Sequence, residues 1–264
     1  MSACTVIGLG EAGAVYATAL AEAGHAVTGY DPVAPTTPAG VVRADTAAEA
    51  CRAADVVLVL TGAGAARAVA AECLPVMQED TCYADLTSSS PQTMEELGGT
   101  PSRALFADVA ILGPVPVQGA RTPLMVSGPG APVLAELLGG IGAPVEVVAG
   151  GPGAAMAHKL LRSVVMKGMA SVVVEAVTAA RAAGQEEWIR AQIAGQLAGN
   201  GQAVIDRWLT GTPKHAARRA HEMRSTAQYL TDLGVPAEMT EASASAMERM
   251  AARAARDQVE ATAS

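Results

Sequence analysis

A glycine-rich turn between a short strand and an alanine-rich helix constrains this chain more than any other stretch. It reads Thr5-Val-Ile-Gly-Leu-Gly-Glu-Ala-Gly13 and continues into an amphipathic helix through residue 20. We expect Gly8 to permit a sharp turn, Gly10 to let a pyrophosphate approach the backbone, and Gly13 to let the helix pack closely on the strand. Free N–H groups at the start of a helix attract an anion. The segment therefore predicts a dinucleotide-binding turn formed by Gly8, Leu9, Gly10, Glu11, Ala12 and Gly13.

An acidic residue follows the glycine turn at the distance that is typical of dinucleotide-binding domains. A second predicted strand, residues 26–30, ends at Asp31, about 20 residues after the turn, where a carboxylate accepts hydrogen bonds from the adenosine ribose. This carboxylate would repel a 2′-phosphate, and the next basic residue is Arg43. The sequence thus favours NAD, with NADP as the alternative cofactor. A glycine loop that binds no ligand is the competing interpretation.

Composition limits the classes of partner. The chain has 264 residues, half of them hydrophobic, which is enough for two medium-sized domains. The net charge of −8 and the lack of a basic run interleaved with aromatics argue against a nucleic-acid partner. The most apolar segment, residues 160–183, is not expected to span a membrane because four charged residues interrupt it: Arg162, Lys167, Glu175 and Arg181. We expect a small-molecule partner.

The cysteines and the first residues predict a cytoplasmic protein. The first strand starts within about three residues, which leaves no room for a signal peptide. The four cysteines form no CxxC pair and predict small core residues rather than disulfides or zinc ligands: Cys4, Cys51, Cys73 and Cys82. The four histidines show no ligand spacing with carboxylates, so no metal site is predicted.

The first part of the chain alternates apolar strands with helices. The predicted strands are residues 5–7, 26–30, 55–60, 81–85, 123–128 and 143–148. This alternation predicts a parallel sheet with helices on both faces, which is a Rossmann-type α/β domain over residues 1–150. Ligands bind at the carboxyl ends of such strands. We therefore expect binding residues in the loops that begin at Leu60-Thr61, at Asp85 and at Asp108.

The remainder, residues 151–264, predicts an all-α domain for substrate binding or dimerisation. The predicted helices are residues 154–183, 185–199, 202–209, 213–233 and 236–256, with Pro213 in the first turn of the fourth. The first of these helices is too apolar to be exposed on any side, which predicts a central or intersubunit position.

Four segments together resemble the β-hydroxyacid dehydrogenases, relatives of 6-phosphogluconate dehydrogenase. They are the glycine turn, Asp85-Leu-Thr-Ser-Ser-Ser-Pro91, Ala107-Asp-Val-Ala-Ile-Leu-Gly-Pro114 and Gly151-Pro-Gly-Ala-Ala-Met-Ala-His-Lys159. Residues 215–223 are similar to a subgroup with a short helical C-terminal domain. The resemblance implies NAD(P)-linked hydride transfer to or from a small hydroxy or keto acid. It also implies a homodimer or a higher homo-oligomer.

The resemblance assigns roles to individual residues. Lys159 matches the family lysine that moves the hydroxyl proton, as a cation beside a developing alkoxide can. A surface lysine that packs its stem on apolar neighbours is the competing interpretation. Ser88 takes the place of the nicotinamide-loop hydroxyl. The positions expected to touch the substrate are Ser88, Leu112, Gly113, Pro114, His158, Arg162, Ser163 and Lys167.

Two of these positions depart from the family. Ser163 stands where many members have an asparagine, and Leu112 replaces the serine that binds the substrate carboxylate. Carboxylate binding would then use backbone N–H groups of Gly113 and its neighbours. We expect part of the lost anion recognition to come from a cation of the long helix: Arg162, His158 or Lys167.

Two alternatives to a hydroxyacid dehydrogenase stay open. An imine or keto reductase has the same two-domain plan, but such relatives usually lack the helix lysine, so Lys159 argues against it. A dinucleotide-binding sensor without catalysis is the other alternative. The departures at Leu112 and Ser163 support it.

Overall fold

The computed structural model describes residues 1–263 and divides the chain into two compact units. The first comprises residues 1–162 and the second residues 163–264, so the border falls within helix α7 (Ala154–Ala182). Among the described helices, none is long and apolar enough to cross a membrane.

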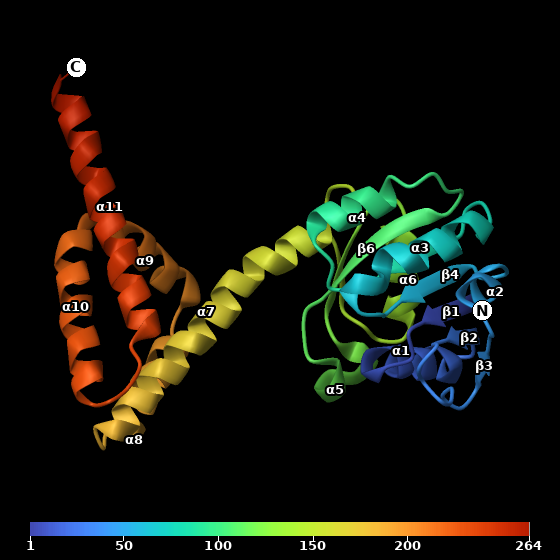
Figure 1. Ribbon diagram of the computed structural model, residues 1–264, viewed down its shortest axis with the longest axis horizontal. Coiled ribbons are helices and arrows are strands. Elements are labelled where there is room, and N and C mark those ends of the chain that lie inside the picture. Colours follow the sequence, from blue (N-terminus) through green and yellow to red (C-terminus); the bar gives the residue numbers. More distant parts are fainter. Residues whose placement is uncertain (264) are drawn as a thin grey trace. The chain divides into compact units, whose positions relative to one another are not determined.

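The first unit is built on one eight-stranded sheet (Figure 1). Its strands are β1 (Ala3–Ile7), β2 (Ala26–Tyr30), β3 (Val41–Arg43), β4 (Val56–Val59), β5 (Cys82–Asp85), β6 (Leu105–Ile111), β7 (Leu124–Ser127) and β8 (Val145–Val147). The order is β3-β2-β1-β4-β5-β6-β7-β8, which confirms the Rossmann-type fold. The order reverses at β1, beside β4, and this switch point is where the glycine turn lies.

The sheet differs from the predicted one in three places. Strand β7 runs antiparallel to β6, because residues 112–123 turn back at one end of the sheet instead of crossing its face. Strand β3 was not predicted, since three residues after a proline-rich loop give little periodicity. Asp108 lies inside β6 and not at the start of a loop, because β6 continues to Ile111.

Helices cover both faces of this sheet (Figure 1). The helical segments of the first unit are α1 (Glu11–Glu22), α2 (Ala47–Cys51), η1 (Ala63–Ala65), α3 (Ala66–Cys73), η2 (Leu74–Val76), α4 (Pro91–Gly98), α5 (Val115–Gln118), η3 (Gly119–Arg121), α6 (Ala131–Gly140) and the first turns of α7. Successive residues of β4 enter opposite cores: Val56 and Leu58 pack on one face, Val57 and Val59 on the other. The four cysteines are buried, which confirms their prediction as core residues.

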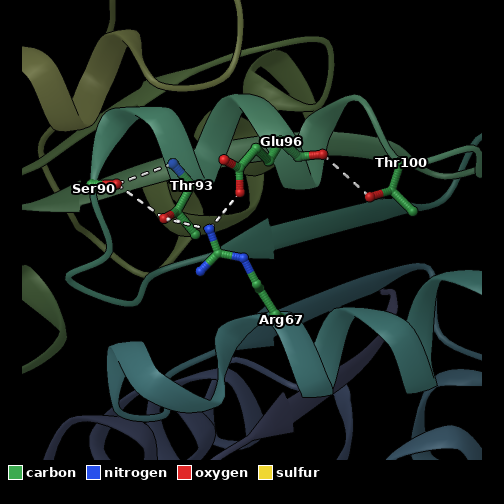
Figure 2. Close-up of polar contacts among 5 residues, drawn as sticks. All are labelled: Arg67, Ser90, Thr93, Glu96 and Thr100. Atoms are coloured by element: carbon green, nitrogen blue, oxygen red, sulfur yellow. Dashed lines mark hydrogen bonds and ion pairs between the residues drawn. The ribbon is translucent and has the colours of Figure 1, made fainter.

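A polar bridge joins helices α3 and α4 (Figure 2). The Arg67 guanidinium donates to Thr93 Oγ1 at 3.3 Å and forms an ion pair with Glu96. Ser90 caps α4 by accepting the Thr93 N–H at 3.1 Å. The bridge and the cap fix the start of α4, and therefore the end of the hydroxyl-rich loop that precedes it.

The second unit contains helices only. They are the rest of α7, α8 (Glu186–Leu197), α9 (Gly201–Lys214), α10 (Ala216–Asp232) and α11 (Glu238–Ala263). Helices α10 and α11 pack on each other, and Ala179 of α7 joins a small core with Ala227 and Leu230.

Two expectations about these helices need correction. Pro213 lies in the last turn of α9, not in the first turn of the next helix. Asn200 caps α9, and the helix ends one residue after the proline, which cannot donate the N–H that would continue the helical hydrogen bonds. Helix α7 is not buried on every side within the single chain, since Leu161 is 70% and Val164 74% exposed, so the central position is wrong and the intersubunit position stays a prediction.

Candidate active site

The glycine turn has the tight geometry that its sequence predicts. Gly8 has φ +92°, and a Cβ there would lie 2.7 Å from the Leu60 carbonyl oxygen. A Cβ on Gly13 would lie 1.8 Å from the Gly8 carbonyl oxygen, so helix α1 packs on the turn as only glycine allows. A Cβ on Gly10, in contrast, would meet no atom of the described chain within 4 Å. Gly10 therefore borders the open space that a pyrophosphate would need.

The N-terminus of α1 is open towards this space. Gly10 is its N-cap, and no side chain caps the helix. The first turn contains Glu11 and Ala12, as predicted. Because the first N–H groups of a helix lack intrahelical partners, they can bind an anion here.

Asp31 closes the other side of the turn. Its Oδ2 accepts the Leu9 N–H at 2.7 Å, and its Oδ1 accepts the N–H groups of Val33 and Ala34 at 2.7 and 3.0 Å. Partial desolvation acts to raise the pKa of Asp31, but these backbone bonds and the Arg43 charge outweigh it and lower the pKa below its ordinary value. The carboxylate is therefore ionised at neutral pH, as an acceptor for ribose hydroxyls must be.

A cavity of about 670 Å³ connects these features. Its lining includes Gly8, Gly10, Asp31, Leu60 and Thr61, which are predicted cofactor residues from three strand ends. Arg43 contacts the lining residue Asp31, since its guanidinium donates to the Asp31 backbone carbonyl at 3.0 Å. The residues therefore fit an adenine dinucleotide.

Lys159 and Ser88 meet at the same edge of the sheet. Lys159 Nζ lies 3.2 Å from Ser88 Oγ, within hydrogen-bonding distance. Ser88 is exposed in the loop after β5, and Lys159 is half-buried in the second turn of α7. The structure thus brings together the predicted acid/base and the predicted nicotinamide-loop hydroxyl, 71 residues apart in the chain.

The other hydroxyls of this loop bond to one another. Thr87 Oγ1 and Ser89 Oγ are 2.7 Å apart and buried, and Ser90 caps α4. Asp85, at the end of β5, accepts the Thr87 N–H at 2.9 Å. These contacts hold the loop rigidly on both sides of Ser88.

Arg162 reaches the loop that follows β6. Its guanidinium donates to the Leu112 carbonyl at 3.3 Å, while the Leu112 N–H donates to the Pro123 carbonyl at 2.9 Å. The Leu112 N–H is therefore already bonded and cannot donate to an anion. Of the two residues that follow, Gly113 and Pro114, only Gly113 has a backbone N–H for the predicted anion site. Lys159 and Arg162 are three residues apart, which places them on one side of α7.

The remaining predicted substrate residues also lie on helix α7. His158 is exposed, and its Nδ1 lies 2.8 Å from the Ala154 carbonyl oxygen one turn earlier. Ser163 and Lys167 follow on α7 in the part that belongs to the second unit. The described residues contain no group of three or more histidine, cysteine or acidic side chains that could hold a metal ion.

Sequence reasoning named Asp85 and Asp108 only as the starts of loops, and it missed that both are buried beside Ser127 at one position across the sheet. Asp108 of β6 pairs in register with Asp85 of β5 and with Ser127 of β7. All three are at most 1% exposed. An acidic residue inside the otherwise apolar run 105–111 was the available signal, because a buried carboxylate requires hydrogen-bonding partners.

Comparison with known proteins identifies both parts of the chain. The model for the NAD binding domain of 6-phosphogluconate dehydrogenase matches residues 3–150, and that for a domain of unknown function, DUF1932, matches residues 180–250. A search of curated proteins found no match.

Solved structures match over nearly the whole length. A conserved hypothetical protein from Sinorhizobium meliloti 1021 is 30% identical, with 94% of this chain and 88% of that chain covered and a TM-score of 0.63. The conserved protein MTH1747, described as similar to 3-hydroxyacid dehydrogenases, is 25% identical, with 94% and 97% covered and a TM-score of 0.65. An imine reductase from Streptomyces aurantiacus shares the fold, with 23% identity, 94% and 93% coverage and a TM-score of 0.78.

Proposed function

Because this chain belongs to the family of NAD-binding oxidoreductases related to 6-phosphogluconate dehydrogenase, we propose that it transfers hydride between NAD and a small hydroxy or keto acid. The contact between Lys159 Nζ and Ser88 Oγ, at 3.2 Å, carries the proposal. It lies at the carboxyl edge of the sheet, where the glycine turn and Asp31 also lie. A proton-transferring group and a dinucleotide site on one sheet edge are what such a reaction needs.

The protein's part in the reaction is to handle the proton. NAD held at the glycine turn and Asp31 would supply the hydride-transfer chemistry, as acceptor in oxidation and as donor, in its reduced form, in the reverse direction. As the C–H bond breaks, the substrate hydroxyl passes its proton to neutral Lys159 Nζ and becomes a carbonyl. In reduction, the Lys159 ammonium returns that proton to the oxygen. Ser88 orients Nζ through its hydroxyl.

Arg162 supplies the charge for an acidic substrate in this proposal. Leu112 has no hydroxyl, and its N–H is engaged with Pro123. The guanidinium of Arg162 lies against the same loop and has further N–H donors for a carboxylate. In a comparison of Arg162→Ala, His158→Ala and Lys167→Ala, only Arg162→Ala should raise KM for the acid strongly, by about tenfold.

The cofactor preference follows from two residues in this proposal. The ionised Asp31 favours NAD, while Arg43 beside it could pair with a 2′-phosphate. Asp31→Ser should therefore shift the ratio of kcat/KM values towards NADP, and Arg43→Ala should shift it towards NAD.

We also propose that the protein acts as a cytoplasmic homodimer or higher homo-oligomer. Helix α7 exposes large apolar side chains, including Leu161 and Val164, and contact with a second copy would remove them from water. Sedimentation of the purified chain tests this, and a monomer at micromolar concentration would contradict it.

A substrate panel with a lysine variant tests the proposed reaction. NADH formation is followed with hydroxy acids, and NADH consumption with keto acids, ketones and imines. We expect turnover with a hydroxy or keto acid, and at least a hundredfold loss in Lys159→Met with unchanged NADH affinity. Turnover of imines alone would favour an imine reductase. NADH binding with no turnover on any substrate would favour a sensor.

A further inference from the structure

The first turn of helix α7 is held by a side chain from the interior of the sheet. Asp108 Oδ2 accepts the N–H groups of Gly153 and Met156 at 2.9 and 3.1 Å. Ser127 Oγ accepts the Ala155 N–H at 3.0 Å and donates to Asp108 Oδ2 at 3.2 Å. These two residues thus satisfy three of the N–H groups that a helix start leaves without partners.

This cap comes from far away in the sequence and is rigid. Asp108 precedes Gly153 by 45 residues and is fully buried in β6. Most N-caps are the residue just before the helix, so they move with it. Here the helix start is attached directly to the central sheet. The adjoining turn is packed tightly as well, since a Cβ on Gly153 would lie 2.7 Å from the Pro91 carbonyl oxygen of α4.

Lys159 follows the capped turn immediately. It lies three residues after Met156, less than one helical turn further. Any rotation or shift of the first turn would therefore move Nζ relative to Ser88. Ser88 is held from the neighbouring strand, through Asp85 and Thr87.

We propose that Asp108, supported by Ser127, is a positioning residue that sets the place of Lys159 against Ser88. Asp108 acts on Lys159 indirectly, through its hydrogen bonds to backbone N–H groups at the start of α7. A carboxyl group is suited to this task because one of its oxygens, Oδ2, accepts three hydrogen bonds, two of them from N–H groups at the positive end of the helix dipole. Burial raises the pKa of Asp108 above its ordinary value, while these hydrogen bonds act in the opposite direction. The effect on turnover rests on the proposed function, while the effect on the lysine itself does not.

The test compares Asp108→Asn and Ser127→Ala with Thr46→Ala. Thr46 caps α2 in the same unit by accepting the Glu49 N–H at 3.1 Å, so its variant controls for the general loss of a cap. We expect Asp108→Asn to lower kcat about tenfold or more, with unchanged NADH affinity, and Ser127→Ala to lower it less. Thr46→Ala should keep the parent kcat at temperatures where all variants are folded. If Asp108→Asn does not fold, the kcat of Ser127→Ala relative to that of Thr46→Ala tests the proposal.

A second readout does not depend on activity. The chain has three lysines, Lys159, Lys167 and Lys214, so reductive ¹³C-methylation gives three lysine signals besides that of the terminal amine, and lysine-to-arginine variants assign them. The Lys159 signal should shift in Asp108→Asn and in Ser127→Ala, and stay in place in Thr46→Ala. An unshifted Lys159 signal, or an unchanged kcat in a folded Asp108→Asn protein, would overturn the positioning role. A shifted signal with full turnover in Lys159→Met would instead overturn the proposed function and leave the positioning of the side chain supported.

Discussion

Helices α1 and α7 both begin after glycine-rich turns, yet their N-termini are treated in opposite ways. At α1 the N-cap is Gly10, and no side chain accepts the first N–H groups. At α7 the buried Asp108 and Ser127 accept three of them. An uncapped helix start can bind an anion from solution, whereas one filled by a buried carboxylate cannot. The N-terminus of α1 is therefore suited to bind an anionic ligand, whereas the capped N-terminus of α7 fixes the position of the residues that follow it.

The most damaging change should be Gly13→Ala, because it removes the close packing that creates the open end of α1. The new Cβ would lie 1.8 Å from the Gly8 carbonyl oxygen, and backbone on both sides leaves no room for relaxation. We expect the free energy of unfolding of the first unit to fall by about 4 kcal/mol or more. Chemical denaturation followed by circular dichroism measures this. A variant with parent stability would show that α1 does not depend on this contact.

Gly10→Ala should separate binding from folding at the same helix. A Cβ there meets no atom of the described chain within 4 Å, so stability should change by less than about 1 kcal/mol. The methyl group would occupy the space expected for the pyrophosphate. NADH affinity should therefore fall about 100-fold, which corresponds to about 2.7 kcal/mol. Fluorescence titration measures the affinity, and equal affinities would place the pyrophosphate elsewhere.

These two glycines show which parts of the molecule the sequence predicts well. The turn at residues 8–13 depends on local steric limits, so the spacing of Gly8, Gly10 and Gly13 was sufficient to predict its backbone geometry. The alternation of strands and helices also predicted the Rossmann-type fold. Chain direction in β7 was not predictable, because period-2 patterns are the same in parallel and antiparallel strands.

The arrangement around Lys159 was predicted only in part. The family resemblance gave Lys159 and Ser88 their separate roles, but neither it nor their neighbours in sequence predicted that the two side chains lie within hydrogen-bonding distance. The cap from Asp108 spans 45 residues and depends on the register of β5, β6 and β7, which no local pattern reveals. Pro213 was misplaced because proline favours the first turn of a helix, whereas here it lies in the last turn of α9 and no local pattern indicates this.

The N-terminus of helix α11, in the second unit, is also capped by a carboxylate from a distant part of the sequence. Glu175 of α7 accepts the N–H groups of Met239 and Thr240 at 2.7 and 2.9 Å, and the Thr240 hydroxyl at 2.6 Å. Glu175→Gln keeps the shape but loses the charge, so the second unit should lose about 2 kcal/mol of stability. Thermal unfolding measures this loss. An unchanged melting temperature would show that a carboxylate at a helix start contributes little in this protein, which would also weaken the argument for Asp108.

The smallest expected effect concerns the carboxylate beside the cap, Asp85. It is fully buried, and within the described residues its Oδ2 accepts no hydrogen bond, while Oδ1 accepts the Thr87 N–H. Burial raises the pKa of Asp85 above the usual 3.8, and the neighbouring charge of Asp108 adds to the rise, although the bonds from Thr87 act in the opposite direction. The folded protein therefore holds this proton at pH values where the unfolded chain has lost it.

This difference fixes the sign of a pH effect. Since the folded state binds more protons between pH 3.8 and the raised pKa, Asp85 makes the protein progressively less stable as pH rises through that range. Asp85→Asn keeps an oxygen for the Thr87 N–H and does not titrate. Its stability relative to the parent should rise with pH and then level off above the raised pKa. Melting temperatures of both proteins from pH 4 to 9 measure it. If the difference in melting temperature between Asp85→Asn and the parent instead became smaller as pH rises, the folded protein would stabilise Asp85 as a carboxylate. The neighbouring positions of Asp85 and Asp108 in the sheet would then hold two negative charges.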